Sequence, residues 1–299
     1  MSDSQRERRK GLLAGAAAYG MWGLFPIYFK ALASVPPLEI LAHRVTWALL
    51  LLLVLVRSRE QMASLRAALR GRSLLLLAAS SLMIGLNWLV YLWSILTDRI
   101  LEASLGYFIT PLVSVLLGVL VLREPLERPL LIATGLAGFG VAWMTLQLGR
   151  PPWIALALAL LFGGYGLLRK VVSVGAVVGL TVETLLLLPL ALGYMAWSRA
   201  SGRLAFLSGS GSRDALLVLS GPLTALPLLL FVGAARRLPL SSLGFLQYLS
   251  PSISFLIAVF LYREPLSLGR LLAFLCIWSG VAILLARQLR PTRALLAPE

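Results

Sequence analysis

The sequence predicts an all-α polytopic membrane protein whose ten transmembrane helices form two inverted repeats of five helices. Three observations predict this fold. Hydrophobic residues make up 59% of the 299 residues and charged residues only 13%, which is too apolar for a soluble domain of this length. The chain also divides into ten apolar stretches of about the 20 residues that a bilayer requires. Finally, one unit of the sequence occurs twice.

The duplication has a period of 140 residues. Pro111 begins a run that reaches Arg-Glu-Pro-Leu at 123–126, and Pro251 begins a run that reaches Arg-Glu-Pro-Leu at 263–266. Between positions 111 and 142, 13 of 32 residues are identical to the residue 140 positions later. The earlier part of each unit keeps this offset more faintly, with three polar or glycine positions aligned: Gly23, Lys30 and His43 on Gly163, Lys170 and Glu183.

Four segments follow from the repeat: a basic cytoplasmic N-terminus (1–10), a first repeat (11–148), a second repeat (151–286) and a cytoplasmic tail (287–299). Helices satisfy their own backbone hydrogen bonds in lipid, and the alternation of barrel strands is missing. The predicted spans are 11–33, 38–56, 73–96, 102–122, 130–148, 153–168, 175–196, 214–235, 239–262 and 270–286. Because five is odd, the second repeat enters the membrane upside down.

The distribution of the basic residues predicts the orientation. With a cytoplasmic N-terminus, 18 of the 27 lysines and arginines fall in inner segments. This excess follows the positive-inside rule and places both termini in the cytoplasm. The net charge of +15 therefore reflects a lipid bilayer rather than nucleic acid as the partner, since no basic patch is interleaved with exposed aromatic residues.

The first two spans carry a predicted kink and an arginine within the apolar region. Pro26 removes a backbone donor from span 1, which predicts a kink, and Trp22 lies one turn earlier. In span 2, His43 shares a face with Glu39, and Arg44 lies about 9 Å into the helix. Arginine at this depth must be paired or reach water. It either snorkels to the outer surface or faces a polar cavity, and we favour the cavity.

Spans 3, 4 and 9 contribute further polar residues. Asn87 and Tyr91 share a face of span 3, where they either join helices or contact a substrate. A polar stripe in span 4 recurs in span 9, each beside a proline: Tyr107, Thr110 and Ser114 beside Pro111, and Gln247, Ser250 and Ser254 beside Pro251. Such hydroxyls can bond their own backbone, but a wet cavity between the two stripes also explains Tyr107 and Gln247, and we favour it.

Span 7 places Glu183 in the apolar region, at the repeat image of His43. An acid in lipid is by default a functional-site hypothesis. Because the second unit is inverted, we expect mirrored depths and no direct bond between the two residues. They are either proton-accepting or gating groups, or Glu183 is paired structurally with a neighbouring helix. Pro227 predicts a further kink in span 8, and small residues make spans 5 and 10 a scaffold or a contact between protomers.

The order of these residues resembles a known family. The quoted pattern is Trp22-Gly23 with Pro26, His43-Arg44, Asn87-Trp88, Glu-Ala-Ser-Leu-Gly-Tyr-Phe at 102–108, Tyr165-Gly166 with Arg169-Lys170, Glu183-Thr184, and Gln247-Tyr248 with Pro251. It resembles the RarD-type branch of the EamA transporters, in the drug/metabolite transporter superfamily, over about residues 8–290. The resemblance implies a ten-helix permease of the bacterial inner membrane, with a central cavity between spans 1–4 and 6–9.

We therefore expect a secondary transporter that exports a small metabolite or drug by alternating access. The expected cavity residues are Trp22, His43, Arg44, Asn87, Trp88, Tyr91, Tyr107, Thr110, Glu183, Gln247, Tyr248 and Ser250, and the expected hinges are Pro26, Pro111, Pro227 and Pro251. Protons are candidate coupling ions and a second copy of the chain is a candidate partner. A passive channel or a membrane sensor is the alternative. With one His, one Cys and no catalytic motif, we expect no enzyme, metal or cofactor.

Overall fold

The computed structural model describes residues 3–96, 100–125, 128–148 and 153–261, with isolated positions between 268 and 282. Within these residues the chain is helical and has no strand. The first nine predicted spans each overlap a helix or a group of consecutive helices, whereas the tenth and the C-terminal tail lie largely outside the described residues. The helices are α1 (Asp3–Gly23), α2 (Phe25–Ala31), α3 (Pro37–Ser58), α4 (Met62–Ala68), α5 (Gly71–Leu96), α6 (Ile100–Leu120), α7 (Arg128–Leu148), α8 (Trp153–Val171), α9 (Ala176–Ala200), α10 (Gly211–Ala235), α11 (Leu240–Leu246), α12 (Leu249–Leu256) and the π-helix η1 (Ile257–Leu261).

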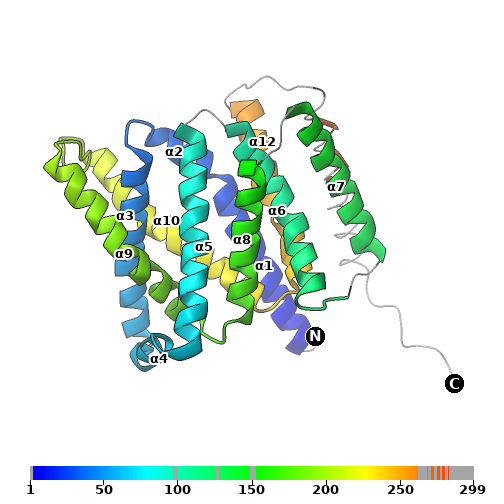
Figure 1. The fold of residues 1–299 in the computed structure, drawn as a ribbon, viewed down its shortest axis with the longest axis horizontal. Coiled ribbons are helices and arrows are strands. Elements are labelled where there is room, and N and C mark those ends of the chain that lie inside the picture. The colour runs from blue at the N-terminus through cyan, green and yellow to red at the C-terminus, as the bar shows by residue number, and fades with distance from the viewer. Residues whose placement is uncertain are drawn as a thin grey trace.

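The long helices stand side by side and run between two ends of the molecule (Figure 1). The N-terminus and α4 mark one end, called here the near end, and α2 marks the far end. Seven helical stretches of the described chain are long and apolar enough to cross a membrane. Leucines such as Leu75 and Leu190 are more than 70% exposed on the bundle surface, which suits lipid rather than water.

The centre of the bundle is one continuous apolar cluster. Its buried members come from α1, α3, α5, α8, α9, α10 and their neighbours, among them Tyr19, Leu52, Ile84, Tyr165 and Phe231. Small residues allow the closest approaches between helices. A Cβ added to Gly221 of α10 would lie 2.4 Å from the Trp47 Cβ of α3, so only glycine fits there.

Two helices are interrupted near a proline. Leu24 separates α1 from α2, because Pro26 cannot donate to the carbonyl one turn earlier. Residues 247 and 248 separate α11 from α12, just ahead of Pro251. Pro111 and Pro227, in contrast, lie within the continuous helices α6 and α10. The proline signal alone therefore does not decide where a helix breaks.

The interrupted helices contact each other. The Ser254 hydroxyl of α12 donates to the Gly23 carbonyl oxygen over 3.1 Å. A Cβ added to Gly23 would lie 2.7 Å from the Cβ of Ile253, so glycine permits this contact. The exposed backbone at the end of α1 is thus satisfied by a side chain from the other half of the chain.

Residues separated by the repeat period also meet. The rings of Trp22 and Phe162 lie 5.6 Å apart between centroids. The rings of Phe108 and Tyr248 stack at 6.5 Å, and the Tyr248 hydroxyl donates to the Phe108 carbonyl oxygen over 3.3 Å. Both pairs join one half of the sequence to the other.

Candidate functional site

Arg44 lies buried on α3 and does not snorkel to the surface. It is 8% exposed, and its Nε donates to the Thr224 hydroxyl of α10 over 2.8 Å. Aromatic rings surround the guanidinium group, whose carbon lies 4.9 Å from the ring centroid of Trp88, 5.9 Å from that of Phe29 and 6.0 Å from that of Phe25. Cation–π contacts of this kind stabilise a desolvated guanidinium without cancelling its charge.

No carboxylate among the described residues forms an ion pair with Arg44. The phenols of Tyr28, Tyr91 and Tyr107 lie close enough to it to interact electrostatically. Tyr91 of α5 and Tyr107 of α6 lie 5.8 Å apart between ring centroids. Within the described part of the chain, neither their hydroxyls nor the terminal nitrogens of Arg44 have a hydrogen-bond partner. The cluster therefore offers unused donors next to a positive charge, which is the chemistry of an anion site.

A second buried arginine has its own counter-ion. Arg169 of α8 is fully buried, and its Nη1 lies 3.4 Å from Oε1 of Glu183 on α9. The hydroxyl of Ser80 donates to the same carboxylate oxygen, and that of Tyr165 donates to Oε2 over 3.4 Å. A Cβ on Gly179 would lie 2.1 Å from Nη1 of Arg169, so the glycine makes room for the guanidinium group. Glu183 thus belongs to a buried ionic cluster, in which Arg169 supplies the counter-charge although its guanidinium nitrogens make no hydrogen bond to a described residue.

The partners of His43 lie outside both arginine clusters. Its Nδ1 accepts the indole N–H of Trp47 over 3.0 Å, so the neutral ring carries its proton on Nε2. Nε2 lies 4.0 Å from Oε1 of Glu39, and the ring centroid lies 4.6 Å from that of Phe206. His43 and Glu183 have different partners, and neither bonds to the other.

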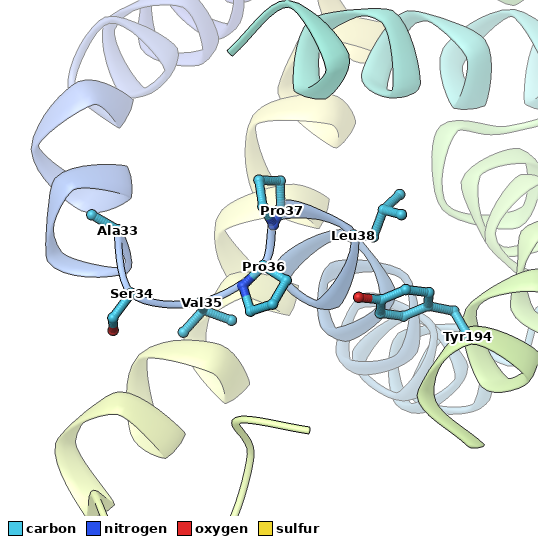
Figure 2. Close-up of a pocket in the computed structure, with 7 residues that line it drawn as sticks. All are labelled: Ala33, Ser34, Val35, Pro36, Pro37, Leu38 and Tyr194. Carbon is cyan, nitrogen blue, oxygen red and sulfur yellow. The ribbon is translucent and has the colours of Figure 1, made fainter. Parts of the chain in front are cut away.

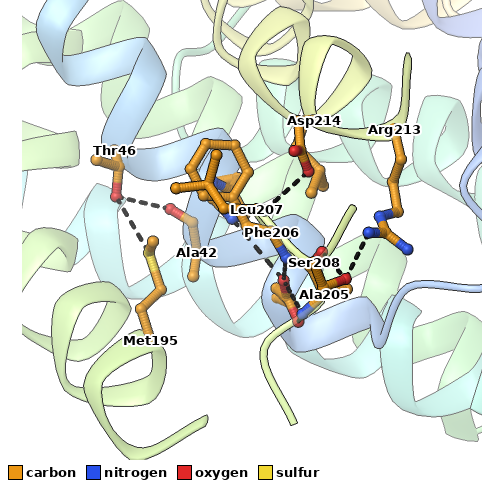
Figure 3. Close-up of polar contacts among 12 residues, drawn as sticks. Ala42, Thr46, Met195, Ala205, Phe206, Leu207, Ser208, Arg213 and Asp214 are labelled. Atoms are coloured by element: carbon orange, nitrogen blue, oxygen red, sulfur yellow. Dashed lines mark hydrogen bonds and ion pairs between the residues drawn. The ribbon is translucent and has the colours of Figure 1, made fainter. Parts of the chain in front are cut away.

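Glu39 holds the loop between α9 and α10, defined here as residues 201–210. Both of its carboxylate oxygens accept the backbone N–H of Ala205, over 2.9 and 3.0 Å, and Oε1 also accepts that of Phe206 over 2.8 Å. Figure 3 shows this loop packed against α3 and the start of α10. Asp214 accepts the Leu207 N–H over 3.0 Å at the exposed side of the same loop.

The remaining predicted residues have mostly structural contacts. The Asn87 amide donates to the Leu158 carbonyl oxygen of α8 over 3.1 Å, and the Thr110 hydroxyl donates to Gly106 of its own helix over 2.7 Å. Gln247 is 5% exposed, and its amide makes no hydrogen bond to a described residue. Trp22 packs against Phe162, Tyr248 packs on Phe108, and Ser250 lies in the first turn of α12. These three are the last of the predicted cavity residues.

The structure therefore brings four predicted residues together, on α3, α5 and α6: Arg44, Trp88, Tyr91 and Tyr107. Sequence reasoning did not place Thr224, Arg169 or Glu39 in a site. Arg169 lies at the basic end of an apolar span, so its position in the sequence indicates only a charge that orients the span in the membrane. Glu39 gave the one available signal, because it shares a helix face with His43.

A surface pocket of about 410 Å³ lies at the far end of the bundle, apart from these residues (Figure 2). It is lined by the connection between α2 and α3 and by Tyr194 of α9. None of the predicted site residues lines it. Because Arg44 is almost fully buried, a ligand reaches it in this conformation only if the surrounding rings separate.

A bundle of apolar helices that buries ionised groups inside and exposes leucine outside defines a multi-pass membrane protein. The chain belongs to the EamA-like transporter family, whose model matches residues 9–146. It is 42% identical to the uncharacterized transporter YojE of Bacillus subtilis, over 96% of this chain and 97% of the relative. It is 40% identical to the protein RarD of Escherichia coli K12, over 93% and 94%.

The fold has also been seen in a crystal structure of a distant protein. That structure is 21% identical to this chain, has a TM-score of 0.71, and covers 94% of this chain and all of its own length. At this identity the likeness concerns the fold alone.

Proposed function

We propose that the protein is a secondary transporter that exports a small metabolite or drug by alternating access between two inverted repeats. Several relatives are named transporters, and the RarD relatives share almost the whole length of this chain. The observation that carries the proposal is Arg44, a buried cation that has no counter-ion among the described residues, where α3, α5, α6 and α10 meet. An arginine that only faces water or only stabilises the bundle does not need to be unpaired at this depth.

The packing supports the inverted-repeat plan. α1 packs on α10 as α5 packs on α8, and these two pairs are images of each other under the 140-residue offset. The contacts Trp22–Phe162 and Phe108–Tyr248 then lie on the axis that relates the repeats. Many transporters build their sites at such a repeat interface.

The two repeats differ where their helices are interrupted. α1 and α2 are separated at Leu24, whereas their image α8 is continuous, and α11 and α12 are separated although their image α6 is continuous. Exchange of these two conformations between the repeats would turn the molecule from one access state to the other. In this proposal both termini are cytoplasmic, so the far end faces outward across the bacterial inner membrane.

Arg44 binds the anionic group of the substrate in this proposal. Its Nε is held by Thr224, which leaves the terminal nitrogens free for a bidentate contact, and Tyr91 and Tyr107 add two hydroxyl donors. No catalytic constellation accompanies these groups among the described residues, so transport without a chemical step is the function that we infer.

The test is transport in proteoliposomes. A ligand panel screened by thermal shift first identifies stabilising anions, and their flux is then measured for the wild type, Arg44→Ala and Arg44→Lys. We expect Arg44→Ala to abolish saturable flux of anionic ligands while the protein still elutes as a folded species. Undiminished flux and binding of every anionic ligand in Arg44→Ala would remove Arg44 from the site.

Protons remain candidate coupling ions. Glu183 is a buried acid with hydroxyls from Ser80 and Tyr165 on its oxygens, but Arg169 already compensates its charge. Flux with and without a pH gradient decides the matter. Coupling that disappears in Glu183→Gln would assign the proton to this cluster, and flux that ignores the gradient would make the protein a facilitator.

A further inference from the structure

We infer that Glu39 and the backbone of Ala205 and Phe206 form the gate that closes the far end of the substrate path. This inference rests on the proposed transport function. In it, Glu39 is a positioning residue that holds the 201–210 loop of the second repeat on α3 of the first. Opening toward the far end then requires the release of this loop.

The contact has the features of a latch. Glu39 is fully buried and its two oxygens accept three hydrogen bonds from two consecutive backbone amides. Hydrogen bonds to a carboxylate are stronger than neutral ones. No basic residue of the described chain forms a close ion pair with Glu39, since its neighbour His43 is 4.0 Å away and is held as a neutral ring by Trp47. The hydrogen bonds that the Glu39 carboxylate accepts from described residues therefore all come from the loop.

The ring of Phe206 allows the loop held by Glu39 to cover part of α3. This ring lies 4.6 Å from that of His43 and 6.3 Å from that of Trp47, between centroids, and so covers the first turns of α3 (Figure 3). The backbone bonds to Glu39 fix the position of this ring, because Phe206 itself donates one of them. If the loop detaches, the aromatic cover over His43 leaves with it.

The same cluster reaches the Arg44 site. Phe29 of α2 and Phe206 of the loop pack against one buried group, formed by Leu32, Val35, Ile40 and Leu217. Phe29 also lies over the guanidinium group of Arg44. The Tyr28 hydroxyl donates to the Leu216 carbonyl oxygen over 3.2 Å and ties α2 to α10. Release of the loop therefore removes support from the rings that close the anion site.

The first experiment measures backbone hydrogen exchange, which does not depend on transport. Glu39→Ala and Glu39→Gln are compared with Asp214→Asn, a matched control in the same loop that replaces the charged acceptor of the Leu207 N–H with an amide oxygen. We expect the amides of Ala205 and Phe206 to exchange at least tenfold faster in Glu39→Ala, with a smaller increase in Glu39→Gln. In Asp214→Asn the increase should be confined to Leu207. Unchanged exchange at 205 and 206 in Glu39→Ala would overturn the latch.

The second experiment asks whether the latch is a gate or only a structural tie. In a Cys276→Ser background, His43→Cys places a thiol beneath Phe206, and a membrane-impermeant maleimide is added to the far end of reconstituted protein. We expect Glu39→Ala to raise the labelling rate at least tenfold over the rate with Glu39 present. Faster amide exchange without faster labelling would show a structural tie and overturn the gate. If labelling increases in Glu39→Ala but the wild type transports no ligand in proteoliposomes, the loop still closes the far end and the transport proposal fails instead.

Discussion

Arg44 and Arg169 are two buried arginines in one membrane bundle, and their charges have different partners. Arg169 faces the Glu183 carboxylate at 3.4 Å within its own repeat. Arg44 has a hydroxyl and aromatic rings as neighbours but no carboxylate of the described chain. In a low-dielectric interior the two charges of an ion pair offset each other, whereas the charge of an unpaired cation still attracts an anion. The comparison teaches that burial alone does not distinguish the two arginines, whereas the lack of a counter-ion among the described residues does.

The largest effect should follow removal of the counter-ion of Arg169. Glu183→Ala leaves a buried, uncompensated guanidinium group, and we expect it to cost about 3–5 kcal/mol of unfolding free energy. Thermal unfolding of the purified protein in detergent measures the loss. The double change Glu183→Leu with Arg169→Met should recover most of this loss, because it removes both charges. An unaltered unfolding temperature in Glu183→Ala would contradict the pairing.

The next effect concerns the space that Arg169 occupies. Gly179→Ala places a Cβ where Nη1 of Arg169 now lies, and we expect a loss of about 1–3 kcal/mol from overpacking. Gly193→Ala is the matched control in the same helix, because nothing lies within 4 Å of its added Cβ. The control should leave stability unchanged or raise it slightly. Equal unfolding temperatures for the two variants would show that the guanidinium group can move away.

Around Arg44 the expected effects on stability are smaller and those on anion binding are larger. Thr224→Val removes the acceptor of the Nε donor and should cost about 1 kcal/mol of unfolding free energy. It should weaken a stabilising anionic ligand about tenfold, because the guanidinium group loses its fixed orientation. Binding isotherms of the ligand found by thermal shift measure the change. A neutral analogue of that ligand should lose much less affinity.

The smallest effect on stability should come from Tyr107→Phe. Its hydroxyl has no hydrogen-bond partner among the described residues, so its removal should change unfolding by less than about 0.5 kcal/mol. If the hydroxyl donates to a bound anion, the affinity still falls several-fold. Titration of the same ligand into Tyr107→Phe gives the answer, and full affinity would limit the anion contact to Arg44 and Tyr91.

Sequence patterns could predict the spans, because apolar runs and breaking residues set helix positions directly. The kink near Pro26 and the buried position of Arg44 also follow from local chemistry. The partners of the buried charges do not. Arg169 turns inward because Gly179, on a neighbouring helix, leaves room for it, and no spacing rule indicates such a vacancy.

The Glu39 contact was hidden for a different reason. Its partners are backbone amides more than 160 positions away, and a backbone N–H has no residue signature. Likewise, the sequence left open whether Asn87 joins helices or contacts a ligand, and the structure gives it a carbonyl of α8 as partner. Long-range contacts to the main chain are therefore the part of such a site that residue patterns do not reveal.

The stacked pair Phe108 and Tyr248 has a consequence for the ancestry of the chain. Under the proposed plan, a single ancestral unit would have paired with an inverted copy of itself, and the residue at this position would have faced its own duplicate across a two-fold axis. A charged side chain repels its own copy, whereas an aromatic ring stacks on it. After the duplication the two positions could diverge. Tyr248 now carries a hydroxyl that donates to the main-chain carbonyl oxygen of Phe108, the residue at the equivalent position of the first repeat.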